Sequence, residues 1–111
     1  MSIKGNYIKL NDIIDTMVKT RCEDDNFCIY GADGELFGDK EYLASGYPQV
    51  DENDNEVYPQ DASNRGLSYI YSGEQFADVI LSVIEQKPSA SNQDFIDALN
   101  YYLENDGFLD F

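Results

Sequence analysis

The sequence predicts a single small α+β domain, in which three helices pack against a short, mostly antiparallel sheet. Its 111 residues suit one compact core, since domains usually contain roughly 100 to 150 residues. Three stretches repeat apolar residues at helical intervals, and short apolar or aromatic runs lie between them. Nine tyrosines and six phenylalanines are too many for a disordered acidic tail. We therefore expect residues 1–111 to fold as one domain.

The first helix is predicted at about residues 10–22. Apolar residues recur there at intervals of three and four, which places them on one helical face. Asn11 or Asp12 can accept hydrogen bonds from the free backbone amides of the first turn. The apolar face consists of Leu10, Ile13, Ile14, Met17 and Val18.

Several short segments are typical of β-strands. The run 26–30 is apolar and aromatic and stops at Gly31, and 67–71 alternates apolar with small or aromatic residues. We expect these two strands to pair, because each needs a neighbour for its backbone hydrogen bonds. Segments 35–37 and 42–43 predict one or two further strand pieces.

A second helix is predicted immediately after the last of these strands. Ser72 is placed to cap the amide of Gln75, and Tyr71 stands opposite Phe76 as in a hydrophobic staple. Pro88 prevents the helix from continuing. The stripe expected to face the core consists of Phe76, Val79, Ile80, Val83 and Ile84.

A third helix is predicted after a short turn. Ser91 is the expected cap, Asp94 lies near the positive end of the helix dipole, and Gly107 is expected in the left-handed position that ends the helix. Because the connection is short, we expect the second and third helices to be antiparallel neighbours.

Negative charge is concentrated in the middle of the chain. The formal net charge is -15, and residues 22–64 hold twelve acids and one base. Within them, residues 45–64 are predicted to form a long acidic loop rich in turn-forming residues. Such a field repels nucleic acid phosphates and anionic membranes. We therefore expect the chain to bind neither, and a basic protein is the natural partner.

The residue types restrict the possible chemistry. The chain contains no histidine, which removes imidazole acid–base catalysis and histidine-ligated zinc. Adjacent carboxylates such as Asp24 and Asp25 lack a flanking pattern that would mark an active site. We therefore expect no enzymatic activity and no cofactor. Cys22 and Cys28 are too few for a disulfide framework and are expected to be free and buried.

One run of oxygen-bearing side chains is similar to a metal-binding motif. Asp51, Asn53 and Asn55 alternate as in the first half of an EF-hand calcium loop. Glu56 stands where that loop needs Gly, and Ala62 stands where it needs a bidentate Glu. We therefore expect no metal here, and a calcium-binding module is kept as an alternative.

Tyrosines interleave with the acids of the middle segment, a combination that suits a protein interface. Tyrosine covers a large area with few rotatable bonds, and carboxylates can replace phosphates in a basic cleft. The predicted partner-binding residues are the loop acids with two flanking tyrosines, followed by acids near the 26–30 strand: Asp51, Glu52, Asp54, Glu56, Tyr47, Tyr58, Asp24, Asp25, Asp33 and Glu35.

The C-terminal half resembles a family of small acidic bacterial proteins. The resemblance lies in residues 72–80, 86–91 and 98–108, and its most specific part is the Asn-Tyr-Tyr-x-x-Asn-Asp-x-Phe segment that begins at Asn100. Some members of that family are similar to immunity proteins of contact-dependent growth inhibition and related polymorphic toxin systems. In those systems the immunity protein binds and neutralises the toxic C-terminal domain of an effector.

The resemblance implies an immunity protein that binds a toxin domain, expected to be a basic nuclease, and blocks its substrate cleft. An acidic nucleic-acid mimic of the anti-restriction or anti-CRISPR type would use the same charge and is the alternative. We expect the protein to be a monomer. We expect it in the cytoplasm, because the N-terminus lacks a signal-peptide pattern and no apolar run approaches the roughly 20 residues of a membrane span.

Overall fold

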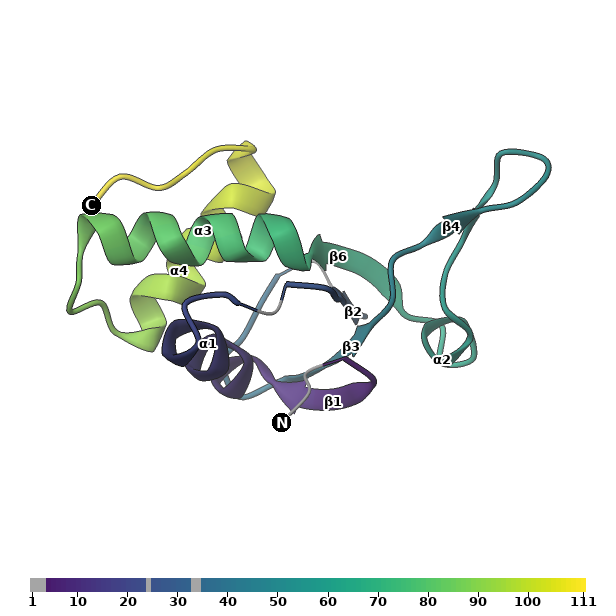
Figure 1. The fold of residues 1–111 in the computed structure, drawn as a ribbon, viewed down its shortest axis with the longest axis horizontal. Coiled ribbons are helices and arrows are strands. Elements are labelled where there is room, and N and C mark those ends of the chain that lie inside the picture. Colours follow the sequence, from purple (N-terminus) through teal and green to yellow (C-terminus); the bar gives the residue numbers. More distant parts are fainter. Residues whose placement is uncertain (1–3, 24, 33–34) are drawn as a thin grey trace.

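The computed structural model describes residues 4–23, 25–32 and 35–111 and confirms a small α+β fold (Figure 1). The structure contains the three predicted helices and one further short helix, α2, that was not predicted. None of the helices in the described ranges is long and apolar enough to cross a membrane. In chain order the elements are β1 Asn6–Lys9, α1 Leu10–Lys19, β2 Cys28–Gly31, β3 Glu41–Ser45, β4 Gln49–Val50, β5 Glu56–Val57, α2 Gln60–Ser63, β6 Ser68–Ser72, α3 Gly73–Gln86 and α4 Asn92–Asn105.

The main sheet has four antiparallel strands in the order β1-β3-β2-β6. The predicted pairing of the 26–30 and 67–71 strands is confirmed by β2 and β6, in which Ile29 lies opposite Tyr71. Strand β1 was not predicted. It is the edge strand beside β3, where Ile8 lies opposite Tyr42.

The first helix starts at residue 10, as predicted, but its predicted capping residues and its predicted end were wrong. Helix α1 follows β1 directly, and the residue at its N-cap, Lys9, makes no side-chain capping bond. Carbonyl groups of a neighbouring loop accept the first-turn amides instead. The Leu10 amide donates to Lys40 at 3.1 Å and the Asn11 amide to Gly38 at 3.0 Å. The helix ends at Lys19, before a turn at residues 20–22.

Residues 35–37 were predicted as a strand piece and form none. The Asn100 side chain of α4 forms hydrogen bonds with both backbone groups of Leu36. Its Oδ1 accepts from the Leu36 amide at 2.8 Å, and its Nδ2 donates to the Leu36 carbonyl at 3.0 Å. A side-chain amide thus replaces a neighbouring strand and fastens this segment to α4.

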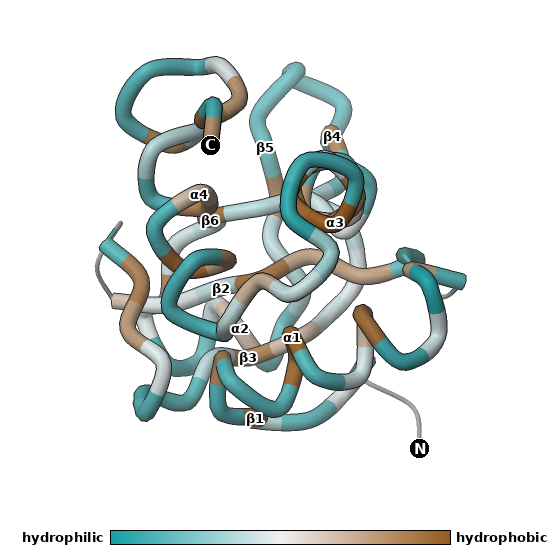
Figure 2. Tube along the Cα trace, turned by 90° about the vertical axis from the view of Figure 1, so that its left-hand side faces the viewer, coloured by the Kyte–Doolittle hydropathy of each residue, from teal (hydrophilic) through white to brown (hydrophobic). Residues whose placement is uncertain are grey.

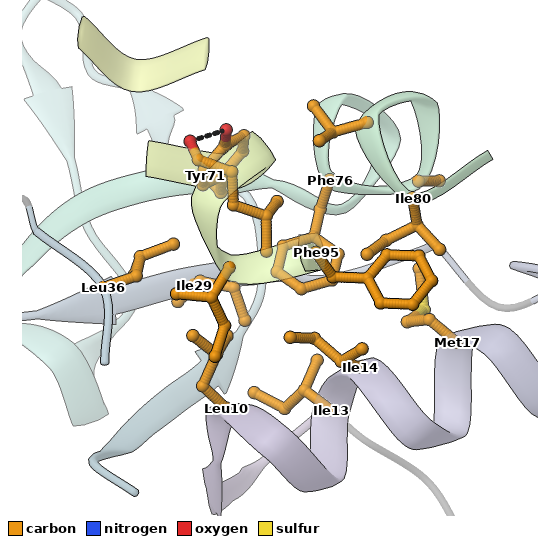
Figure 3. Packing of buried hydrophobic residues seen from close by; sticks show 14 of the residues in the cluster. Leu10, Ile13, Ile14, Met17, Ile29, Leu36, Tyr71, Phe76, Ile80 and Phe95 are labelled. Carbon is orange, nitrogen blue, oxygen red and sulfur yellow. Dashed lines mark hydrogen bonds between the residues drawn. The ribbon is translucent and has the colours of Figure 1, made fainter. Parts of the chain in front are cut away.

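Helices α1, α3 and α4 enclose the main core with one face of the sheet (Figure 3). Ile13, Ile14 and Phe76 are fully buried. The Tyr71 hydroxyl, also buried, donates to the Leu99 carbonyl at 2.7 Å, shown by the dashed line in Figure 3. The expected contact between α3 and α4 is confirmed.

A second, smaller core lies on the other face of the sheet. Side chains alternate along a strand, so Cys28 and Tyr30 point away from Ile29, which belongs to the main core. Leu43 of β3 lies opposite Tyr30 in the sheet, and Ala62 of α2 packs against this cluster. The sheet is therefore sandwiched between the three long helices and the short helix α2.

The predicted starts of the two long C-terminal helices are confirmed. The Ser72 side chain accepts from the Gln75 amide at 3.1 Å, and the Tyr71 ring lies edge-on to Phe76 at 5.7 Å. Ser91 and Asp94 form a reciprocal capping box at the start of α4. The predicted end of α4 was wrong by one residue. Asp106 occupies the left-handed position, with φ 54°, in place of Gly107.

The start of α3 lies unusually close to the chain before β2. The Gly73 amide donates to the Phe27 carbonyl at 2.6 Å. A Cβ at position 73 would overlap the Asp25 carbonyl oxygen and lie 2.7 Å from that of Phe27. Both neighbours are backbone atoms, so only glycine fits this junction.

Candidate functional site

The segment predicted as a long acidic loop, residues 45–64, contains a projecting hairpin and the short helix α2. Residues 49–57, here named the acidic hairpin, pair Gln49 with Val57 and Val50 with Glu56. The hairpin extends from the body at the far end from the long helices (Figure 1), and the molecule measures 45 Å along that axis. In Figure 2 its tip is coloured hydrophilic. The hairpin was not predicted, because strands of only two residues give no recognisable pattern in the sequence.

The Asp51 carboxylate organises the tip of the hairpin. Its Oδ1 accepts from the amides of Asn53 at 2.8 Å and Asn55 at 2.9 Å. The Asp51 amide donates to the Asn55 carbonyl at 3.0 Å, and the Asp54 amide donates to the Asp51 carbonyl at 3.1 Å. The two amides at Oδ1 favour the charged form and lower the pKa of Asp51 below its ordinary value. Asp51 therefore shapes the tip.

The other three hairpin carboxylates, of Glu52, Asp54 and Glu56, are exposed. Among the described residues no Lys or Arg forms an ion pair with them. Asp54 is held in a left-handed conformation with φ 62°, which fixes where its carboxylate leaves the turn. These three negative charges are free to meet a cationic surface.

Sequence reasoning missed two apolar residues of the hairpin. Val50 is 67% exposed and Val57 is 47% exposed. Both lie in a segment whose acids dominate its composition, so no local pattern marked them. Apolar side chains beside unpaired carboxylates provide the contact area that an interface needs.

The two predicted tyrosines lie at the base of the hairpin and differ in exposure. Tyr47 is 37% exposed, and its hydroxyl donates to the Asp25 carbonyl at 3.4 Å. Tyr58 is half-buried, with its ring edge-on to Tyr30 at 5.5 Å. Both line a hollow of about 470 Å³ that also includes Pro48. Tyr47 can therefore offer more surface to a partner than Tyr58.

The remaining predicted residues do not form one cluster. Asp25 lies near the hairpin base through its contact with Tyr47. Glu35 is exposed beyond the other end of β2 and lines a different pocket. Asp24 and Asp33 lie outside the described residues. The structure thus brings Asp25 to the hairpin and separates Glu35 from it.

The alternating run Asp51, Asn53 and Asn55 forms a turn held by side-chain-to-backbone bonds. One of the two Asp51 carboxylate oxygens, Oδ1, already accepts two amides. In the described ranges no group of three or more Asp, Glu or Cys side chains is arranged to hold a metal ion.

The two cysteine thiols are free and buried, as predicted. Burial raises the pKa of both Cys22 and Cys28 to about 11. Thiolate is therefore scarce at neutral pH, which lowers the reactivity of both side chains.

Comparison with known proteins places the chain in a family. Residues 8–111 match the family described as a domain of unknown function, DUF7716. The chain belongs to this family. The match covers every described helix and all but the first residues of β1, so the acidic hairpin, the sheet and the helices lie within one family domain. No curated protein and no solved structure matches the chain.

Proposed function

We propose that this DUF7716 protein is an immunity protein that binds a basic toxin domain, of the nuclease class, and blocks its substrate cleft. The single observation that carries the proposal is the acidic hairpin, which projects from the body with unpaired carboxylates at Glu52, Asp54 and Glu56. The protein acts in the cytoplasm, where an incoming toxin would meet its target.

The electrostatics support rapid capture of a cationic partner. The net charge of -15 creates a long-range attractive field, and such steering can raise association rates toward 10⁸ to 10⁹ M⁻¹s⁻¹ at low salt, an order-of-magnitude figure. The hairpin places three of these charges farthest from the core. A nuclease cleft that is lined by Lys and Arg for phosphates offers the complementary surface.

The geometry of the tip supports tight binding as well as capture. Asp51 fixes the turn through two bonds to its own Oδ1, so the neighbouring carboxylates lose less conformational freedom on binding than they would in a flexible loop. Val50 and Tyr47 add exposed apolar area beside the charges. The resemblance of the 98–108 segment to immunity-type proteins supports the same function.

The test begins with the protein encoded next to this chain, which the proposal identifies as the effector that carries the toxin domain. Its C-terminal domain is produced with the chain in the same cells, and growth and the affinity of the purified pair are measured. We expect the wild-type chain to restore growth. The variant Glu52→Gln with Asp54→Asn and Glu56→Gln should bind at least tenfold more weakly, since removing one partner of a buried charge pair at an interface costs about 2 to 5 kcal/mol.

The matched control neutralises three exposed acids elsewhere, Asp39→Asn, Glu85→Gln and Asp110→Asn. It makes the same change in net charge and leaves the hairpin intact, so its affinity should stay close to that of the wild type. Equal weakening by both variants would show that only overall charge matters and would remove the hairpin from the interface. Growth arrest despite the wild-type chain would refute the immunity function.

A further inference from the structure

A groove separate from the acidic hairpin opens beside the end of β2. It has a volume of about 540 Å³ and lies between β6, the residues that follow β2, and the last turn of α4. No described residue of the hairpin lines it. Its apolar lining includes Ile70 of β6 and Leu103 of α4, of which Leu103 is 38% exposed.

Three sources of negative potential meet at this groove. Glu35 and Glu104 are exposed carboxylates in its lining. Helix α4 ends one residue after Glu104, and its last turn contains no basic residue. The carbonyl groups at a helix C-terminus carry partial negative charge, so an acid in the last turn is unfavourable and a cation is favourable. No Lys or Arg in the described part of the chain pairs with either carboxylate.

The groove also borders an edge strand. Within the described ranges β6 pairs with β2 alone, so its outer edge lacks a strand neighbour. Ser68 and Ile70 of this strand line the groove. Unpaired backbone groups at a sheet edge can accept an extended segment of another chain. An edge strand beside an acidic groove therefore favours an extended basic segment over a small ion.

We propose that the groove binds an extended basic segment of a partner protein. An Arg or Lys side chain of that segment lies between Glu35 and Glu104 and the end of α4, with its alkyl stem on Ile70 and Leu103. Such side chains combine an apolar stem with a charged head, which matches a lining that contains both apolar and acidic side chains. The proposal rests on the groove alone and does not require the hairpin to bind the same partner.

The probe is an acetylated, amidated pentapeptide Val-Arg-Val-Arg-Val, added to the isotope-labelled full chain at low salt. Amide chemical shifts are followed by NMR as the peptide is titrated. We expect the largest changes at residues 68–70 and 102–104. A peptide with citrulline in place of arginine keeps the shape and removes the charge, and we expect it not to bind.

Charge reversal then tests the site. Glu104→Lys removes the acid and suits the helix end, so the variant should stay folded. We expect it to weaken peptide binding about five- to tenfold, the scale of one partly exposed charge pair reversed in sign. The control Glu85→Lys makes the same change in charge at an exposed position of α3. It should alter the affinity by less than about twofold.

The hairpin variant Glu52→Gln with Asp54→Asn and Glu56→Gln separates this proposal from the immunity function. It should bind the peptide as the wild type does. Shift changes centred on residues 49–57, equal effects of Glu104→Lys and Glu85→Lys, or equal binding of the citrulline peptide would each overturn the groove proposal. None of these results would bear on whether the chain neutralises a toxin.

Discussion

The helical side of the sheet and the acidic hairpin differ in what holds them together. The helical side depends on buried apolar contacts, with residues such as Ile14 and Phe76 fully removed from solvent. The hairpin has two paired residues in each strand and a turn fixed by Asp51. Its exposed valines contribute little to either core. The contrast teaches that charge and stability are carried by different parts of the chain, so each can be altered separately.

The largest expected effect on stability is at the junction of α3 with the chain before β2. Gly73→Ala should lower the free energy of unfolding by about 3 kcal/mol or more, because the new Cβ meets two backbone carbonyls that cannot move aside. Urea unfolding measures the change. Gly107→Ala is the control, since its Cβ meets only the Asn105 oxygen at 3.9 Å, and should change stability by less than about 0.5 kcal/mol. Equal effects would mean that the junction is not tight.

The next largest effect is expected at Asn100. Asn100→Ala leaves both backbone groups of Leu36 without their partner and should cost about 2 kcal/mol, the penalty for unsatisfied partly buried groups. Asn105→Ala, which loses one exposed bond to the Tyr101 carbonyl, should cost less than about 0.5 kcal/mol. A small loss at Asn100 would show that water replaces its two bonds.

A local effect, without global unfolding, is expected when Asp51 is protonated. Its pKa in the folded protein lies below the ordinary value of 3.8, so its contribution to the tip is complete above that value and is lost as pH falls through the folded pKa. We expect the amide resonances of Asn53 and Asn55 to lose their folded positions in acid before the core unfolds. Asp51→Ala should lack these positions at every pH. Simultaneous loss of tip and core would show that the two regions are coupled.

The smallest effect on stability is expected from the three free hairpin acids. Neutralising Glu52, Asp54 and Glu56 removes no described bond and reduces repulsion between neighbouring carboxylates. Thermal unfolding of that variant should match the wild type. A clear loss of stability would contradict the separation of charge from fold.

The sequence alone predicts the elements whose signals are local. Ser72 and Ser91 cap helices within three residues of their partners. The starts of α3 and α4 could therefore be predicted from nearby residues in the sequence. Segment 35–37 could not be placed, because Asn100 holds it from 64 residues away. Strand β1 pairs with the distant strand β3, as in the pair Ile8 and Tyr42, and passes into α1 without a turn residue.

The candidate site was predicted only in part, for a related reason. Composition located the acids of residues 51–56, but the strands beside them are too short to give a periodic signal. Asp51 holds the turn and its neighbouring acids stay exposed, and this difference depends on how the turn folds. The groove at Leu103 and Glu104 joins residues from three distant segments, so no motif could reveal it.

The two buried cysteines lie on opposite faces of the sheet. Cys22 belongs to the main core beneath the helices, and Cys28 belongs to the smaller core beneath α2. Because each thiol is shielded and poorly ionised, an alkylating reagent can reach it only after its own layer opens. The rate of alkylation of each thiol therefore reports how often its own layer opens. Single Cys→Ala variants would allow the two rates to be measured separately.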